Sequence, residues 1–135
     1  MNHASLRIDA TEELLDEIEN DFSGYQISRY KKGQNFAFGK GSHSESSISV
    51  VLVDGNSTNE LVLEVNRFLA EIRTEAGARL KAATTSILRL GFTVGDSEQF
   101  TVTADFSPEN LALMGTFGIA LEFSAYPTSD TANTT

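Results

Sequence analysis

The sequence predicts an α+β domain, a two-layer sandwich in which three helices cover one face of a mostly antiparallel sheet. Five segments alternate apolar and polar side chains, as strands with a single buried face do. Three other segments repeat apolar side chains at helical spacing behind a residue that can cap a helix. Residues 1–127 are expected to form this single domain, and residues 128–135 a disordered polar tail.

The first third of the chain predicts a strand, a helix and a second strand. Apolar and polar side chains alternate over residues 4–10. Thr11 offers an N-cap oxygen to a helix whose apolar face repeats over residues 14–22. Residues 25–30 alternate again, and the Gly- and Ser-rich residues 34–47 that follow predict a mobile loop.

The middle of the chain predicts a central strand over residues 47–53 and then the longest helix, from Ser57 to Ala83. Ser57 lies three residues before Glu60, the spacing at which a hydroxyl and a carboxylate cap each other's backbone N–H groups. At Gly77 we expect this helix to kink or restart, because glycine costs about 1 kcal/mol relative to alanine in a helix interior. Its apolar stripe consists of Leu61, Val65, Phe68, Leu69, Ile72 and Ala76.

The last third predicts a hairpin, a helix and a final strand. Residues 88–94 and 100–106 alternate around a short polar turn, which indicates two antiparallel strands. Ser107 and Pro108 provide an N-cap and an N1 proline for the third helix, and residues 119–125 alternate as the last strand. The expected order is therefore β-α-β-β-α-β-β-α-β, with ferredoxin-like elements.

The composition indicates a small protein without disulfide bonds. The chain has 135 residues and no cysteine, which excludes disulfides and zinc–thiolate sites. No basic segment followed by an apolar run opens the chain, and no stretch reaches the roughly 18 apolar residues of a membrane span. We therefore expect a soluble, cytoplasmic protein with no cofactor and no membrane association.

The charge is strongly acidic, with a net charge of −9. Residues 9–21 hold seven carboxylates and no basic residue, whereas residues 22–44 hold four basic residues and no acid. Such a field repels phosphate backbones, so it disfavours nucleic-acid binding and favours a basic protein partner.

Several short segments together carry a family resemblance. They are Ala-Ser-Leu-Arg-Ile at 4–8, Phe-Leu at 68–69, Ser-Pro-Glu-Asn-Leu at 107–111, Phe-Gly-Ile at 117–119 and Tyr-Pro at 126–127. With the mid-chain amphipathic helix, they resemble a bacterial family of small α+β domains of unknown function, over most of the chain. The resemblance implies a two-layer sheet-and-helix domain and assigns no activity and no site residue.

No motif identifies an enzyme. Five residues rather than four separate Gly33 from Gly39, and no helix is expected after Lys40, so this segment departs from a phosphate-binding loop. His3 and His43, the two histidines of the sequence, fall in segments that we expect to be exposed. Enzymatic activity stays uncertain, and the sequence favours its absence.

A metal site is also disfavoured. Glu12 with Asp16, and Glu13 with Glu17, are spaced i, i+4 on the first helix and could hold a hard cation weakly. Carboxylates on one exposed helix face are usually hydrated, and no turn gathers oxygen ligands here. We expect no bound metal.

The sheet face opposite the helices is the candidate site. We expect Tyr and Arg side chains on it, the types that dominate interaction hot spots. The candidate interaction residues are Arg7, Tyr30, Arg89, Glu122 and Tyr126. Ser5, Ser28, Thr103 and Ser124 are expected on the same face.

We hypothesise a non-enzymatic domain that binds a protein partner or self-associates through the sheet face or an edge strand. A sharper form is an immunity-type inhibitor whose acidic surface blocks a basic nuclease toxin. The alternative is a small-molecule-binding domain or enzyme with a site at residues 36–46 and the sheet mouth. RNA binding ranks last, because no basic and aromatic signature lies on the central strands.

Overall fold

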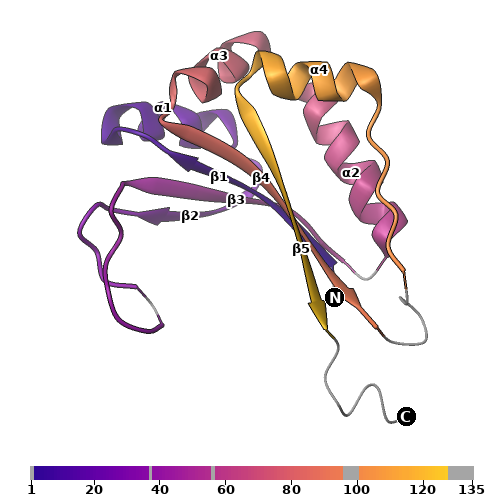
Figure 1. Ribbon diagram of the computed structural model, residues 1–135. Helices are drawn as coiled ribbons and strands as arrows, with labels where there is room; N and C mark the ends of the chain where they lie inside the picture. Colours follow the sequence, from indigo (N-terminus) through magenta and orange to yellow (C-terminus); the bar gives the residue numbers. More distant parts are fainter. Residues whose placement is uncertain (1, 37, 56, 96–100, 128–135) are drawn as a thin grey trace.

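Four helices lie on one face of a five-stranded sheet in the described part of the chain (Figure 1). The computed structural model of this protein describes residues 2–36, 38–55, 57–95 and 101–127. The predicted two-layer α+β architecture is confirmed, although the helices number four rather than three. The predicted polar tail at 128–135 lies outside the described residues.

The strands follow the spatial order β2-β3-β1-β4-β5. Neighbouring strands are antiparallel except β4 and β5, which are parallel and are joined by a connection that contains α4. The sheet is therefore mostly antiparallel, as the alternating sequence predicts. The strands are β1 Asn2–Asp9, β2 Gln26–Tyr30, β3 Ser47–Gly55, β4 Thr85–Val94 and β5 Ile119–Pro127.

Three of the helices begin at side-chain caps that local sequence predicts. The hydroxyls of Thr11, Ser57 and Ser107 each accept a hydrogen bond from a backbone N–H three residues further along. Each cap satisfies a donor that the helix itself leaves free. The helices are α1 Glu12–Asp21, α2 Thr58–Glu71, α3 Thr74–Ala82 and α4 Pro108–Thr116.

Two helices replace the single helix predicted from Ser57 to Ala83. The backbone of Ile72 and Arg73 is extended, so the chain turns between α2 and α3. This turn lets α3 lie beside α1, where Arg79 donates two hydrogen bonds of 2.6 Å to the Asp21 carboxylate. Gly77, where the break was expected, lies inside α3. The element order is consequently β-α-β-β-α-α-β-α-β.

The predicted hairpin is wrong, because β4 has no edge left for a second hairpin strand. One edge of β4 pairs with β1 and the other with β5. Residues 101–106 form no strand, and Asn66 of α2 donates a 3.3 Å hydrogen bond to the Asp105 carbonyl. Val102 and Phe106 are half-buried against the core. The alternating pattern of this segment therefore reflects one side packed on the core, although the segment pairs with no described strand. Residue 100 lies outside the described residues.

The hydrophobic core fills the space between the sheet and the helices. On β1, Leu6 and Ile8 are fully buried, whereas their neighbours Ser5 and Arg7 point to the opposite face. Leu88 and Leu90 continue this buried face on β4, and α1, α2 and α3 contribute to the same cluster. The expected burial of a single sheet face is thus confirmed. The buried helix residues that complete the core include Leu15, Ile18, Leu61, Val65, Phe68, Leu69 and Leu80.

Candidate interaction face

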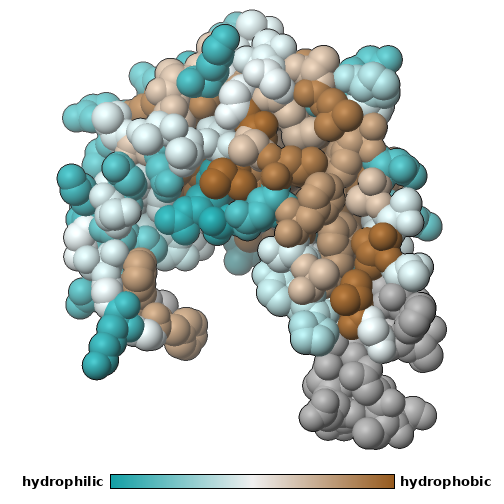
Figure 2. All heavy atoms as spheres, viewed as in Figure 1, coloured by the Kyte–Doolittle hydropathy of each residue, from teal (hydrophilic) through white to brown (hydrophobic). Residues whose placement is uncertain are grey.

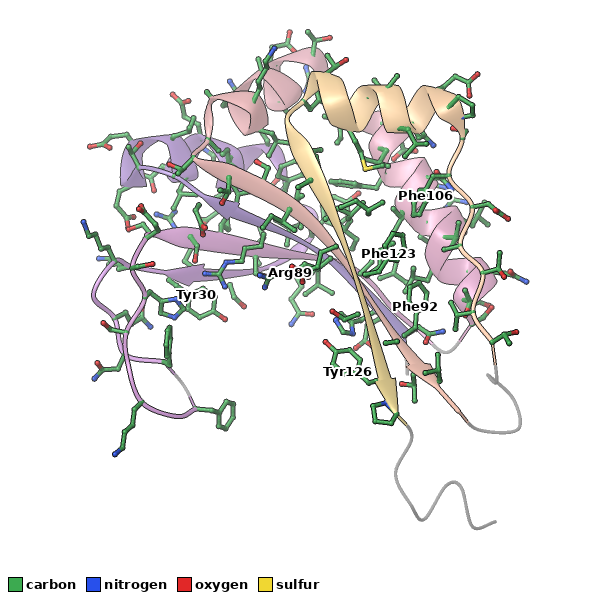
Figure 3. All side chains as sticks on the ribbon, in the orientation of Figure 1. Tyr30, Arg89, Phe92, Phe106, Phe123 and Tyr126 are labelled. Atoms are coloured by element: carbon green, nitrogen blue, oxygen red, sulfur yellow. The ribbon has the colours of Figure 1, made fainter. Side chains whose placement is uncertain are left out.

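The open face, defined as the sheet face opposite the helices, carries all five candidate residues. Arg7 of β1 alternates with the buried Leu6 and Ile8, and the strand register extends this face to the other strands. Figure 3 shows Tyr30, Arg89 and Tyr126 on the side of the sheet away from the helices. Thr103 was expected here, but it belongs to the segment outside the sheet. Ser5, Ser28 and Ser124 lie in register on this face.

An ion pair between Arg89 and Glu122 joins β4 to the edge strand β5 on the open face. The two residues are register partners on β4 and β5, and Arg89 Nε lies 3.3 Å from Glu122 Oε1. Nε is buried, yet its N–H is not aligned for a hydrogen bond. The side chains of Arg89 and Glu122 remain 40% and 47% exposed, so a partner can reach the remaining guanidinium donors of Arg89.

Arg7 is held by its own strand. Its Nε donates a 3.4 Å hydrogen bond to Asp9 Oδ1, and Asp9 Oδ2 accepts a 2.9 Å hydrogen bond from the Thr85 hydroxyl. These contacts link the end of β1 to the start of β4. Asp9 thus joins the side chain of Arg7 to the start of β4.

The connection between β2 and β3, described over residues 31–36 and 38–46, forms an arm with its own backbone pairing, which the Gly- and Ser-rich composition does not predict. The Gly33 N–H donates to the His43 carbonyl and the His43 N–H to the Gln34 carbonyl, both at 2.8 Å. Farther out, the Phe36 N–H donates to the Gly41 carbonyl at 3.1 Å. Gly33 and Gly41 have φ values of 86° and 114°, a conformation that glycine adopts without strain.

His43 fastens the arm to the sheet, so the expectation of an exposed loop histidine is wrong. Its ring stacks on Tyr30 with centroids 4.7 Å apart and meets Phe36 edge-on at 4.9 Å. Beyond this contact the arm presents Phe38, whose side chain is 91% exposed. Figure 2 shows the surface hollowed between the arm and the lower end of β5, with hydrophilic side chains above the hollow.

Tyr126 stands at the opposite end of the face from Tyr30. Its ring lies 6.4 Å from that of His3, which in turn covers Gly91 of β4. A Cβ at position 91 would stand 2.3 Å from His3 Cε1, so glycine makes room for the imidazole. The sequence gives one signal of this contact, a glycine in a strand interior.

Arg29, one of the four basic residues between positions 22 and 44, belongs to the helix side. It points to the same face of β2 as Ile27, two residues earlier. Its guanidinium forms ion pairs with Glu12, Asp16 and Glu19 of α1. The neighbouring Ser46 hydroxyl, and after it the Arg29 guanidinium, lower the pKa of Glu12 from its ordinary value against the opposite effect of burial. Two of the carboxylates considered for a cation are thereby paired with arginine.

A cavity of about 430 Å³ on the helix side was missed by sequence reasoning. It lies between the end of α1 and the α2–α3 turn, with Tyr25, Phe68 and Arg73 among its lining residues. Burial, followed by the charges of Glu71 and Glu64, raises the pKa of Tyr25 above its ordinary value. The Tyr25 hydroxyl is therefore a hydrogen-bond donor at neutral pH.

The described residues include no group of metal ligands and no helix that could span a membrane. No three His, Asp or Glu side chains there are grouped so that they could hold a metal ion. No helix there has the length and hydropathy to cross a bilayer.

Comparison with protein-family models, curated proteins and solved structures finds no match to this chain. The resemblance to a bacterial family of unknown function stays a prediction.

Proposed function

We propose that the chain is a non-enzymatic protein-interaction domain whose open face and arm contact a protein partner. The observation that carries the proposal is the uncovered sheet face, on which Tyr30, Arg89 and Tyr126 reach solvent. Tyrosine and arginine supply the largest truncation costs at protein interfaces. The open face carries an aromatic side chain at each of its two ends, Tyr30 and Tyr126, which favours contact with a partner over contact with water alone.

The arm adds an apolar anchor beside this face. Burying a side chain such as Phe38 contributes about 1.5–3 kcal/mol relative to leaving it in water. Its base is fixed by the backbone pairing and by the His43 stack, so little ordering entropy is lost on binding. Tyr30 touches the arm and also lies on the open face, which makes the two parts one surface.

The charge supports a basic partner, and the immunity-type inhibitor is the sharper form of the proposal. The net charge of −9 attracts a basic partner to the chain as a whole. Long-range attraction of this kind raises association rates and weakens as salt is added. A basic nuclease toxin fits that description.

Calorimetric titration with purified basic nuclease domains, at low and high salt, tests the proposal. We expect binding that weakens with salt and that falls roughly 30-fold, a loss of about 2 kcal/mol, in Arg89→Ala and in Phe38→Ala. The matched control is Leu63→Ala, an exposed apolar residue of α2 in the helical layer, which should bind normally. Binding that does not change with salt concentration would contradict the charge-steered partner. Binding that only Leu63→Ala weakens would contradict the open face as the binding surface.

A small-molecule site is the second candidate, favoured by the cavity beside Tyr25. Its volume of about 430 Å³ falls within the range of ligand pockets. It lies on the helix side rather than at residues 36–46, where the sequence suggested such a site. A compound that raises the melting temperature of the wild type but not of Tyr25→Ala would favour this reading.

A further inference from the structure

β5 is an exposed edge of the sheet. It is the last strand in the order, and no described strand pairs with its outer edge. At nine residues it is longer than the five or six typical of strands, whereas the other edge strand, β2, has five residues. A long free edge is a template for pairing with another strand.

Apart from Pro127 at its last position, β5 lacks the usual protections of an edge strand. No lysine and no proline occur from Ile119 to Tyr126, and the nine register pairs with β4 run without a bulge. The charged side chain of this strand, Glu122, points to the open face and is ion-paired with Arg89. The edge is thus long, regular and nearly free of charge.

Apolar side chains lie beside this edge on the helix side of the sheet. Phe123 is 52% exposed, with the rings of Phe92 and Phe106 each 6.4 Å away (Figure 3). A groove of about 290 Å³ runs between β5 and the segment at 102–104, and Val102 and Ala125 are among its lining residues. Hydrophobic side chains gather over this part of the molecule in Figure 2. They would leave water if another strand joined the sheet.

We propose that a second copy of this chain occupies the β5 edge, so that the two β5 strands pair antiparallel about a two-fold axis at Phe123. In this register Phe123 faces Phe123 of the second copy, and Leu121 faces Ala125 of the second copy. Glu122 faces Ser124 of the second copy, so no like charges are opposed. The interface uses one patch twice, as a two-fold dimer requires.

Charge selects a second copy over a charge-steered partner at this edge. At β5 a basic partner would find no unpaired carboxylate, because Glu122, the one charged residue of this strand, is already paired with Arg89. Two copies that each carry −9 can meet only where their charges are sparse. The dimer would form one continuous sheet with an open face and an arm from each copy. This assembly is independent of whether the open face binds a partner.

Sedimentation velocity over a concentration series tests the dimer. We expect a reversible dimer that tightens as salt screens the repulsion between copies, the opposite of the salt effect expected at the open face. Phe123→Lys and Ala125→Lys, both at exposed positions, should each give a monomer with an unchanged circular dichroism spectrum. The control Leu63→Lys should still dimerise. A wild type that is monomeric at every salt concentration, or a dimer that survives both β5 variants, overturns the proposal.

A single cysteine tests the register, because the chain has none of its own. Directly opposed residues in antiparallel strands have Cα atoms about 4.5–5.5 Å apart, within the range that a disulfide bridges. Oxidised Phe123→Cys should therefore form a covalent dimer, whereas Leu63→Cys should not. Equal yields from the two variants overturn the proposal.

Discussion

Gly77 of α3 lies directly against the ring of Phe117 at the end of α4. A Cβ on Gly77 would stand 2.2 Å from Phe117 Cε1, closer than real side chains approach. The contact brings the third and fourth helices together over the sheet, and Phe117 is buried there. A glycine that sequence reasoning treats as a helix breaker is thus a packing position.

Replacing glycine by alanine inside a helix usually stabilises the fold, but at Gly77 this contact should make the same change destabilising. Gly77→Ala should destabilise the fold by about 1–3 kcal/mol through overpacking, whereas Gly115→Ala in α4, with open space around it, should stabilise it by roughly 0.5–1 kcal/mol. Urea denaturation measures both. Stabilisation by Gly77→Ala would show that Phe117 moves aside without cost.

The ion pairs of Arg29 should contribute more than an isolated surface pair. Arg29→Gln leaves three neighbouring carboxylates of α1 without their cation, so we expect a loss of about 1 kcal/mol, discounted for the partial exposure of the network. Arg67→Gln breaks one exposed pair with Glu64 and should change stability by less than about 0.5 kcal/mol. Equal losses in chemical denaturation would contradict the role of Arg29 in holding α1 to β2.

Glu12 should make the fold acid-sensitive. Its pKa in the folded state is lower than the ordinary value of 4.5, so in that range the unfolded state binds more protons. The stabilisation from the ionised Glu12 is therefore present above pH 4.5 and is lost as pH falls from there through the folded-state pKa. Glu12→Gln should flatten the fall of stability in this window, and its exposed neighbour Glu13→Gln should not. Identical slopes for both variants and the wild type would rule the effect out.

The ring of His43 should control the order of the arm. His43→Ala removes contacts with Tyr30 and Phe36 that are each worth about 0.5–1.5 kcal/mol. We expect the amides of Gly33 and Phe36, hydrogen-bonded within the arm, to exchange roughly 5- to 150-fold faster. Ser44→Ala is the adjacent control. Unchanged exchange in His43→Ala would mean that backbone pairing alone orders the arm.

The features that sequence predicts correctly are local. The caps at Ser57 and Ser107 need only neighbouring residues, and the burial of Leu6, Ile8, Leu88 and Leu90 follows from period-two alternation. The placement of Arg7, Arg89 and Glu122 on one face follows from the same alternation. The hairpin prediction was wrong because β1 and β5 occupy the two edges of β4. The sequence of residues 88–106 alone does not reveal these pairings.

The missed contacts of the site depend on residues far apart in the chain. Arg29 shares the phase of Ile27, and Glu12, Asp16 and Glu19 recur on one side of α1, so the sequence contains a signal for this cluster. The stack of His43 on Tyr30 has no such signal, because it requires the arm to fold back. The cavity beside Tyr25 likewise exists only where α1 meets the α2–α3 turn.

Photo-crosslinking from the open face tests the central claim most directly. Benzoylphenylalanine replaces Ser28, exposed on β2 far from the β5 edge, or Leu63 of α2 as the control, and each protein is irradiated with a basic nuclease domain that it binds. We expect a covalent adduct of both chains from position 28 and none from position 63. Adducts from position 63 alone would show that the partner sits on the helices and would contradict the open face as the binding surface.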